Sequence, residues 1–326
     1  MTSEVSMKEL IESGLSPRET DRLIPQIIKN PHAMGQIKAM LLEMPTRHKL
    51  IVGDARNMNQ IKGGSVHLIV TSPPYWTLKE YNSNPNQLGE ISDYIEFLDN
   101  LDKVWSECYR VLAPGGRLVV VVGDVCLSRR KVGKHSVVPL HSDIQVRCRN
   151  IGFDNLAPIL WYKIANAKFE AEGNGNGFLG KPYEPNCIVK NDVEYILMER
   201  KSGSYRSPDV KSRLLSVISK EDHKVWFQQI WTDVKGESTR NHPAPFPEEL
   251  AMRLVRMFSF VGDTVLDPFC GTGTTLLAGM KSGRNSIGIE IDKQYAAFAA
   301  KRLQREASSL HMNRKLEIVS ELRPST

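Results

Sequence analysis

The chain has 326 residues, of which 41% are hydrophobic and 25% charged, a composition typical of a globular protein that can bury a core. No apolar run reaches the roughly 18 residues of a membrane span, and the opening MTSEVSMKEL lacks the layout of a signal peptide. The five cysteines show no CxxC spacing, which argues against a zinc site or a disulfide framework. The net charge of +6 does not by itself distinguish nucleic-acid binding from an ordinary solvated surface. We therefore expect a cytoplasmic protein without a membrane segment and without a metal.

Residues 7–44 are predicted to form short helices. Apolar side chains recur there at helical spacing, and Ser16-Pro17 supplies an N-cap followed by a first-turn proline. The stretch 9–24 has the layout of a helix-turn-helix, which is common by chance. Helices that dock or dimerise are the simpler interpretation, with DNA contact as the alternative.

Buried strands and helices alternate from residue 49 onward. Continuous apolar runs predict strands at 49–53, 66–70 and 117–122, and the stripe of large apolar residues over 93–112 predicts an amphipathic helix. Because the runs are continuous and separated by helices, they indicate an α/β fold, with a mostly parallel Rossmann-like sheet covered by helices on both faces. Residues 166–220 are instead glycine-rich, basic and aperiodic apart from the strand-like VEYILMER, and they predict loops or a small inserted lobe.

Residues 264–292 predict a nucleoside-binding frame of strand, glycine loop, helix and strand. Asp267 ends the first strand, the loop spans 269–273, and Glu290 ends the second strand about twenty residues after the loop. The loop is neither GxGxxG nor a Walker loop, and Asp267 would repel a pyrophosphate. An acidic residue suits a ligand with a cationic amino-acid part and a neutral nucleoside, which describes S-adenosylmethionine.

The loop that follows residue 71 has the chemistry to hold an aromatic amine. Ser72, Pro73, Pro74, Tyr75 and Trp76 follow directly on a buried strand, at the sheet edge where α/β proteins bind ligands. The two prolines remove two amide donors, so the loop presents carbonyl oxygens, the Ser72 hydroxyl and two aromatic rings. Acceptors on both amine hydrogens would free the nitrogen lone pair for attack on a sulfonium methyl group. The target base would have to leave the duplex and stack on Tyr75 or Trp76.

Together these motifs resemble the amino-methylating DNA methyltransferases of bacterial restriction–modification systems. The resemblance runs from about Lys49 to Arg302, in the permuted order in which the catalytic motif precedes the cofactor motif. It implies methyl transfer from S-adenosylmethionine to an exocyclic amine of a base in a specific double-stranded DNA sequence.

The resemblance also assigns cofactor-binding residues. It implies that Asp267, Phe269, Gly271 and Gly273, with Thr274, line the methionine end of the cofactor, that Glu290 holds the ribose and that Asp54 contacts the adenine. The segment HPAPFPEEL resembles one that packs over the cofactor, so that His242 and Phe246 would touch it, with helix entry and core packing as the alternative. The strand ending in Asp54 is expected to lie beside the one ending in Glu290.

The resemblance further implies a division of the chain. We expect an N-terminal helical extension (1–48), a catalytic half (49–165), a target-recognition insert (166–225), a cofactor-binding half (226–310) and a C-terminal tail (311–326). The basic insert is expected to contact DNA through Lys168, Lys181, Arg206, Lys211 and Arg213. Whether a cognate endonuclease accompanies the protein, and whether it is a monomer or a homodimer, stays open.

Several alternatives concern the target. Ser72 favours N4 of cytosine over N6 of adenine, because related loops begin with Asp or Asn for adenine and more often with Ser for cytosine. Methylation of cytosine C5 would need a nucleophilic cysteine in a Pro-Cys pair, which is absent. An RNA methyltransferase and a DNA-binding protein without catalysis remain the other interpretations.

Overall fold

A computed structural model of the chain describes residues 6–78, 86–127, 132–134, 136–163, 191–236, 247–309 and 314–320. Within these ranges the strands are β1 (Arg47–Val52), β2 (Val66–Thr71), β3 (Leu112–Val122), β4 (Val125–Leu127), β5 (Ser136–Val138), β6 (Phe153–Tyr162), β7 (Val193–Lys201), β8 (Ile230–Trp231), β9 (Thr264–Asp267), β10 (Asn285–Glu290) and β11 (Lys315–Ser320). The helices are α1 (Met7–Glu12), α2 (Pro17–Ile27), α3 (Pro31–Glu43), α4 (Tyr94–Val111), α6 (Leu140–Ile151), α8 (Val210–Leu215), α9 (Lys220–Trp226), α10 (Glu248–Phe258), α11 (Thr274–Lys281) and α12 (Lys293–Ser309), with short 3₁₀ turns η1 (Trp76–Leu78) and η2 (Leu88–Glu90).

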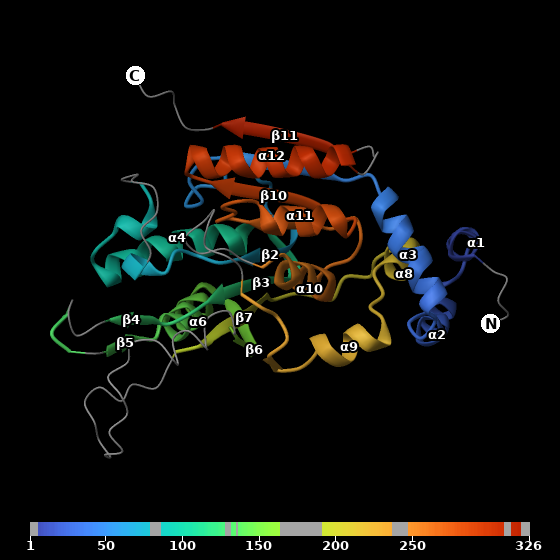
Figure 1. The fold of residues 1–326 in the computed structure, drawn as a ribbon, viewed down its shortest axis with the longest axis horizontal. Coiled ribbons are helices and arrows are strands. Elements are labelled where there is room, and N and C mark those ends of the chain that lie inside the picture. Colours follow the sequence, from blue (N-terminus) through green and yellow to red (C-terminus); the bar gives the residue numbers. More distant parts are fainter. Residues whose placement is uncertain are drawn as a thin grey trace, which may run out of the picture.

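A twisted sheet in the order β11-β1-β10-β9-β2-β3-β7-β6-β8 forms the centre of the molecule (Figure 1). The strands from β11 to β3 are all parallel, and β7 runs antiparallel to both of its neighbours. Helices α4 and α6 pack on one face, while α10, α11 and α12 pack on the other. The expected mostly parallel sheet with helices on both faces is therefore confirmed.

The sheet joins the two ends of the permuted chain. Strand β1 pairs in parallel with β10, and Val52 lies opposite Glu290. Parallel strands end at the same sheet edge, so the residues that follow β1 meet those that follow β9 and β10. The expected neighbourhood of Asp54 and Glu290 is confirmed.

Strand β7 falls within the predicted insert of 166–225 and belongs to the central sheet. This strand lies inside the sheet, hydrogen-bonded to β3 on one side and β6 on the other. Ile196 and Leu197 point to opposite faces and are both fully buried, which a strand in a surface lobe could not achieve. Residues 166–190 of the predicted insert lie beyond the described residues.

Both ends of the chain also pack onto the main domain. The N-terminal helices form one apolar cluster with α8 that includes Met7, Ile27 and Leu214, so they dock on their own chain. The predicted tail of 311–326 contains a strand, because β11 pairs in parallel with β1 along its whole length. None of the described helices is long and apolar enough to cross a membrane.

Candidate active site

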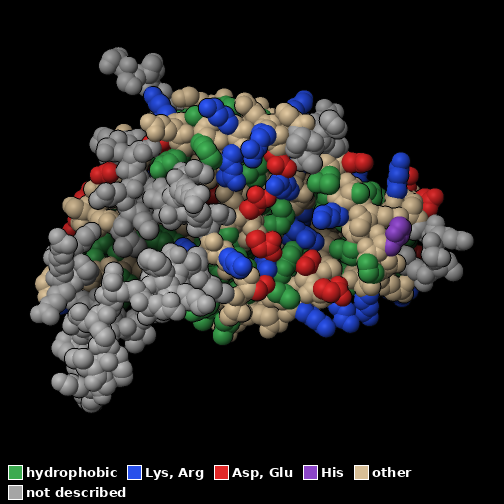
Figure 2. Space-filling view, viewed as in Figure 1, with side chains coloured by type: hydrophobic (Ala, Val, Ile, Leu, Met, Phe, Trp, Pro, Cys, Tyr) green, Lys and Arg blue, Asp and Glu red, His purple; other side chains and the backbone are tan. Residues whose placement is uncertain are grey.

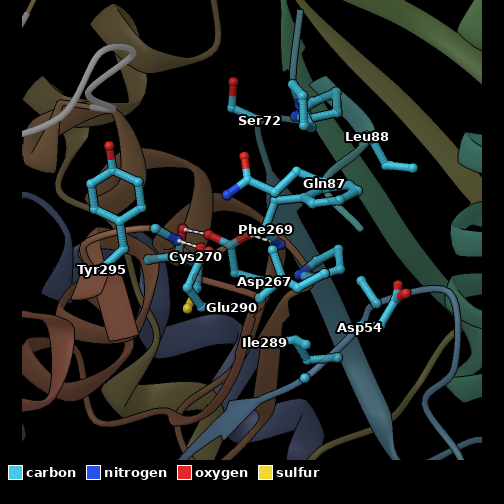
Figure 3. Close-up of a pocket in the computed structure, with 18 of the residues that line it drawn as sticks. Asp54, Ser72, Gln87, Leu88, Asp267, Phe269, Cys270, Ile289, Glu290 and Tyr295 are labelled. Atoms are coloured by element: carbon cyan, nitrogen blue, oxygen red, sulfur yellow. Dashed lines mark hydrogen bonds between the residues drawn. The ribbon is translucent and has the colours of Figure 1, made fainter. Parts of the chain in front are cut away.

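A pocket of about 990 Å³, counted with the open solvent at its mouth, lies at the carboxyl ends of the parallel strands (Figure 3). It is lined by Gly53, Asp54, Ala55, Ser72, Pro73, Pro74, Asn86, Gln87, Leu88, Asp267, Pro268, Phe269, Cys270, Gly271, Thr272, Thr274, Thr275, Ile289, Glu290, Ile291 and Tyr295. The catalytic loop and the cofactor loop predicted from the sequence therefore share one cavity. Its described lining holds three carboxylates and neither lysine nor arginine.

Asp267 is a buried carboxylate at the end of β9, with only 5% of its surface exposed. Thr71 Oγ1 and Thr275 Oγ1 each donate to it at 2.7 Å, and the amide of Phe269 donates at 3.1 Å. Burial raises its pKa to about 6, although these donors favour the charged form. At neutral pH the pocket floor therefore carries a negative charge that is fixed in position.

The glycine loop turns the chain from β9 into α11. Gly271 and Gly273 have φ angles of 48° and 80°, in the left-handed region that side chains rarely occupy. Gly271 lines the pocket, whereas Gly273 lies behind it, where an added Cβ would be 3.1 Å from Cβ of Ala299 in α12. Gly271 thus lines the cavity, where its ligand contact stays a prediction, and Gly273 supplies the tight turn and the close approach of the two helices.

Glu290 ends β10 and closes the glycine loop. Its Oε2 accepts a hydrogen bond from the amide of Gly271 and its Oε1 accepts one from the amide of Asp292, both at 2.8 Å. Burial raises the pKa of Glu290 to about 7, against the effect of these two amides. One carboxylate thus ties the loop to the second strand while it faces the pocket.

Asp54 differs from the other two pocket carboxylates because it is already paired. Arg56 Nη2 donates to Asp54 Oδ2 at 2.6 Å, and Arg56 Nε donates to both oxygens. Arg56 also donates to Asn100 Oδ1 and to the carbonyl of Asn86. Arg56 therefore neutralises Asp54, which suits a neutral ligand group, and anchors the start of the segment 86–88 that lines the pocket.

The start of the predicted catalytic loop lines the pocket, while its two aromatic rings lie outside the lining. Ser72, Pro73 and Pro74 line the pocket, but Tyr75 and Trp76 do not. Tyr75 is 8% exposed, and the Trp76 ring packs edge-on against Tyr94. Tyr75 is therefore buried and Trp76 half-buried, and the stacking of either ring on a base stays a prediction.

Gln87 is a pocket residue that sequence reasoning missed. Its side chain points into the cavity between Ser72 and Asp267 (Figure 3) and is 8% exposed. It has no hydrogen-bond partner among the described residues, although a buried amide is normally paired. Nothing local in the sequence marks it, because only the fold brings the segment 86–88 over the pocket.

Of the residues predicted to bind DNA, the structure describes Arg206, Lys211 and Arg213, and both arginines line a small cavity beside the N-terminal helices. Arg206 pairs through both terminal nitrogens with the buried Asp263, and Arg213 pairs with Asp21 of α2, so both arginines hold the structure together. Lys211 is exposed. On the face shown in Figure 2, basic and acidic side chains intermix rather than forming one basic patch. Four further predicted residues lie outside the described ranges: Lys168, Lys181, His242 and Phe246.

The chain matches the N6/N4 family, described as DNA methylase, over residues 66–301. The type II methyltransferase M.MjaI of Methanocaldococcus jannaschii is 38% identical over 86% of this chain and 99% of its own. The DNA adenine methyltransferase YhdJ of Escherichia coli is 29% identical over 78% of this chain and 82% of its own. The structure of TTHA0409 from Thermus thermophilus, complexed with S-adenosyl-L-methionine, is 50% identical, with a TM-score of 0.69 over 85% of this chain and all of that one. This chain therefore belongs to the family of DNA methylases that act on exocyclic amines, the modification enzymes of restriction–modification systems.

Proposed function

We propose that this protein transfers the methyl group of S-adenosyl-L-methionine to the N4 amine of cytosine in a specific sequence of double-stranded DNA. The observation that carries the proposal is the single pocket that contains both the Asp267–Glu290 frame and Ser72. A cofactor bound on the frame would place its reactive group beside the loop that holds the base.

The lining of the pocket fits this cofactor. S-Adenosyl-L-methionine carries a sulfonium and an ammonium group, and its nucleoside has no phosphate. The described walls offer the charged Asp267, the amide-bound Glu290 and the neutralised Asp54, with no lysine or arginine to attract a phosphate. We assign Asp267 and Phe269 to the methionine end, Glu290 to the ribose and Asp54 to the adenine.

The protein's own residues prepare the amine for attack. The bound cofactor supplies a methyl group on a positively charged sulfur. The lone pair of a base amine is delocalised into the ring, so the amine is a poor nucleophile until acceptors engage its hydrogens. Ser72 can accept one hydrogen, and the proline-bounded carbonyls beside it can accept the other, because Pro73 and Pro74 have no N–H that would compete. The base reaches this position by leaving the duplex. The predicted insert of 166–225, of which 166–190 lie outside the described residues, remains our candidate for recognition of the target sequence.

Cytosine is proposed because the loop begins with Ser72. The name of YhdJ makes adenine N6 the specific alternative. Purified protein, labelled S-adenosyl-L-methionine and unmethylated genomic DNA form the test, followed by digestion to nucleosides and mass spectrometry. We expect N4-methylcytosine. N6-methyladenine alone would contradict the base assignment, and label found only in RNA would contradict DNA as the substrate.

A further inference from the structure

A chain of polar contacts leads from the catalytic loop to β7 and β6. Ser72 Oγ donates to Tyr75 Oη at 3.4 Å, and Tyr75 Oη donates to Glu194 Oε2 at 3.3 Å. Lys163 Nζ donates to the other oxygen, Glu194 Oε1, at 2.7 Å. We propose that Glu194, held by Lys163, is a positioning residue that orients the Ser72 hydroxyl through Tyr75 for methyl transfer. This inference rests on the proposed function, since it concerns the residue that receives the base amine.

The chemistry of the groups fixes the direction of this chain. An ammonium group only donates and an ionised carboxylate only accepts, so Tyr75 must give its proton to Glu194. The phenol oxygen then accepts the proton of Ser72. The lone pairs of Ser72 remain available on the pocket side, where they can accept from an amine N–H. Without Glu194 the phenol could donate to Ser72 instead, and the serine proton could turn toward the amine and oppose it.

The sheet topology explains why a residue so distant in sequence reaches the catalytic loop. Strand β7 is antiparallel to β3, with Tyr195 opposite Val122, so its first residues lie where the parallel strands end. A methyl group built on Gly123 would lie 3.4 Å from Glu194 Cγ and 3.8 Å from Tyr75 Cε2, which shows that these three residues are adjacent. The backbone also fixes the ion pair, because the amide of Lys163 donates to the carbonyl of Asp192.

The position of this pair differs from that of a surface ion pair. The Glu194 side chain is 13% exposed, and its second oxygen faces Tyr75 rather than water. The same two strands carry another cross-strand pair, Arg200 with Asp154 at 2.9 Å, whose side chains are 32% and 45% exposed. Within the described part of the chain that pair makes no hydrogen bond to the catalytic loop, so it serves as a matched control.

The test compares Tyr75→Phe, Glu194→Gln, their double variant and Asp154→Asn. Methyl transfer to unmethylated genomic DNA is followed under single-turnover conditions with saturating enzyme and cofactor, because that rate constant does not depend on the number of target sites. We expect each single variant to be slower by about tenfold, in line with the loss of a hydrogen bond to a charged group. The rate constant of the double variant should lie within about twofold of that of the slower single variant, because both substitutions break the same chain of hydrogen bonds. Asp154→Asn should keep the wild-type rate.

Two further measurements separate positioning from general damage. The affinity for S-adenosyl-L-methionine, measured by calorimetry, and the melting temperature should match the wild type in Tyr75→Phe and Glu194→Gln. A wild-type rate for Glu194→Gln, or single effects that multiply in the double variant, would overturn the proposal. If the wild-type protein methylates no DNA, the proposed function is overturned as well. If the protein is active but the effects of the two substitutions multiply, only this inference is overturned.

Discussion

Asp267 is a buried carboxylate and Glu290 a half-buried one, and both change charge close to neutral pH. Burial raises the pKa of Asp267 from 3.8 to about 6 and that of Glu290 from 4.5 to about 7. The folded protein therefore holds these protons more tightly than the unfolded chain does. Through these two groups the stability of the free protein is greatest below the unfolded pKa values and falls as the pH rises toward 7. A cationic ligand has the opposite preference, because it binds the ionised form.

Cofactor affinity should therefore rise with pH while the stability of the free protein falls. We expect the affinity for S-adenosyl-L-methionine at pH 5 to be about tenfold lower than at pH 7.5, since a pH one unit below the pKa leaves about a tenth of Asp267 ionised. Asp267→Asn should bind at least tenfold more weakly at pH 7.5 and lose most of this pH dependence. Calorimetric titrations from pH 5 to 8 measure both effects. An unchanged pH profile in Asp267→Asn would show that this carboxylate does not face the cation.

The Gln87 side chain has no hydrogen-bond partner among the described residues of the same pocket, and its replacement should separate stability from function. Gln87→Leu keeps the approximate size and removes a buried polar group that has no described partner. The free protein should be as stable as the wild type or slightly more stable, because no hydrogen bond is lost. Turnover or ligand affinity should fall about two- to tenfold, the range for a neutral hydrogen bond to a ligand. Melting temperature, cofactor affinity and kcat/KM are the measurements, and unchanged ligand binding with unchanged turnover would refute the assignment.

At the scale of elements, the parts that were predicted have strong local signals. The apolar runs, the glycine loop and the acidic strand ends located β2, β9, α11 and β10 nearly to the residue. The position of β7 was missed because pairing across the sheet depends on contacts that no local pattern records. The same limit applies to Glu194 and Gln87, whose neighbours are distant in sequence. The edge-on contact of Trp76 with Tyr94 of α4 likewise joins residues whose proximity no local pattern records.

Two glycines should respond in opposite directions to the same substitution. Gly273 begins α11 at φ 80°, and a Cβ there would be 3.1 Å from Ala299 Cβ, so Gly273→Ala should destabilise the fold by about 1–2 kcal/mol or more. Gly35 lies within α3 with no atom within 4 Å of an added Cβ, so Gly35→Ala should stabilise by up to about 1 kcal/mol. Denaturant unfolding measures both. A stable Gly273→Ala protein would mean that the loop can turn without the left-handed residue.

At the scale of the whole molecule, a single domain surrounds a site assembled from both ends of the chain. Strand β1 comes before the catalytic loop in sequence yet completes the cofactor pocket beside β10. The N-terminal helices add a second layer of contacts, since Lys220 donates to the carbonyl of Ile28 and Arg213 pairs with Asp21. These helices support α8 and the start of α9. That packing role is sufficient to explain the apolar spacing of the N-terminal helices, so the spacing is not evidence for a contact with DNA.

Basic residues of the predicted insert should consequently fall into two classes. Arg206 is bound to Asp263, which is 3% exposed, so Arg206→Gln should lower stability by about 1–3 kcal/mol, because the buried carboxylate loses both hydrogen bonds from Arg206 and keeps the one from the Phe260 amide. It should leave the salt dependence of DNA binding unchanged, because its charge is already neutralised. Lys168 and Lys181 keep their predicted role, and replacing either with Gln should reduce the slope of log affinity against log salt concentration by about one.

Two measurements assign each residue to one of these classes. The binding of each variant to the same duplex, at salt concentrations from about 50 to about 200 mM, gives the salt slope, and thermal unfolding gives the stability. Exchange of residues 166–190 for the corresponding segment of a relative should then change which sequence is methylated, while the cofactor affinity stays the same. An exchanged protein that methylates the original sequence would place recognition elsewhere, and the N-terminal helices would become the next segment to exchange. A reduced salt slope in Arg206→Gln would instead show that its pairing with Asp263 opens when DNA binds.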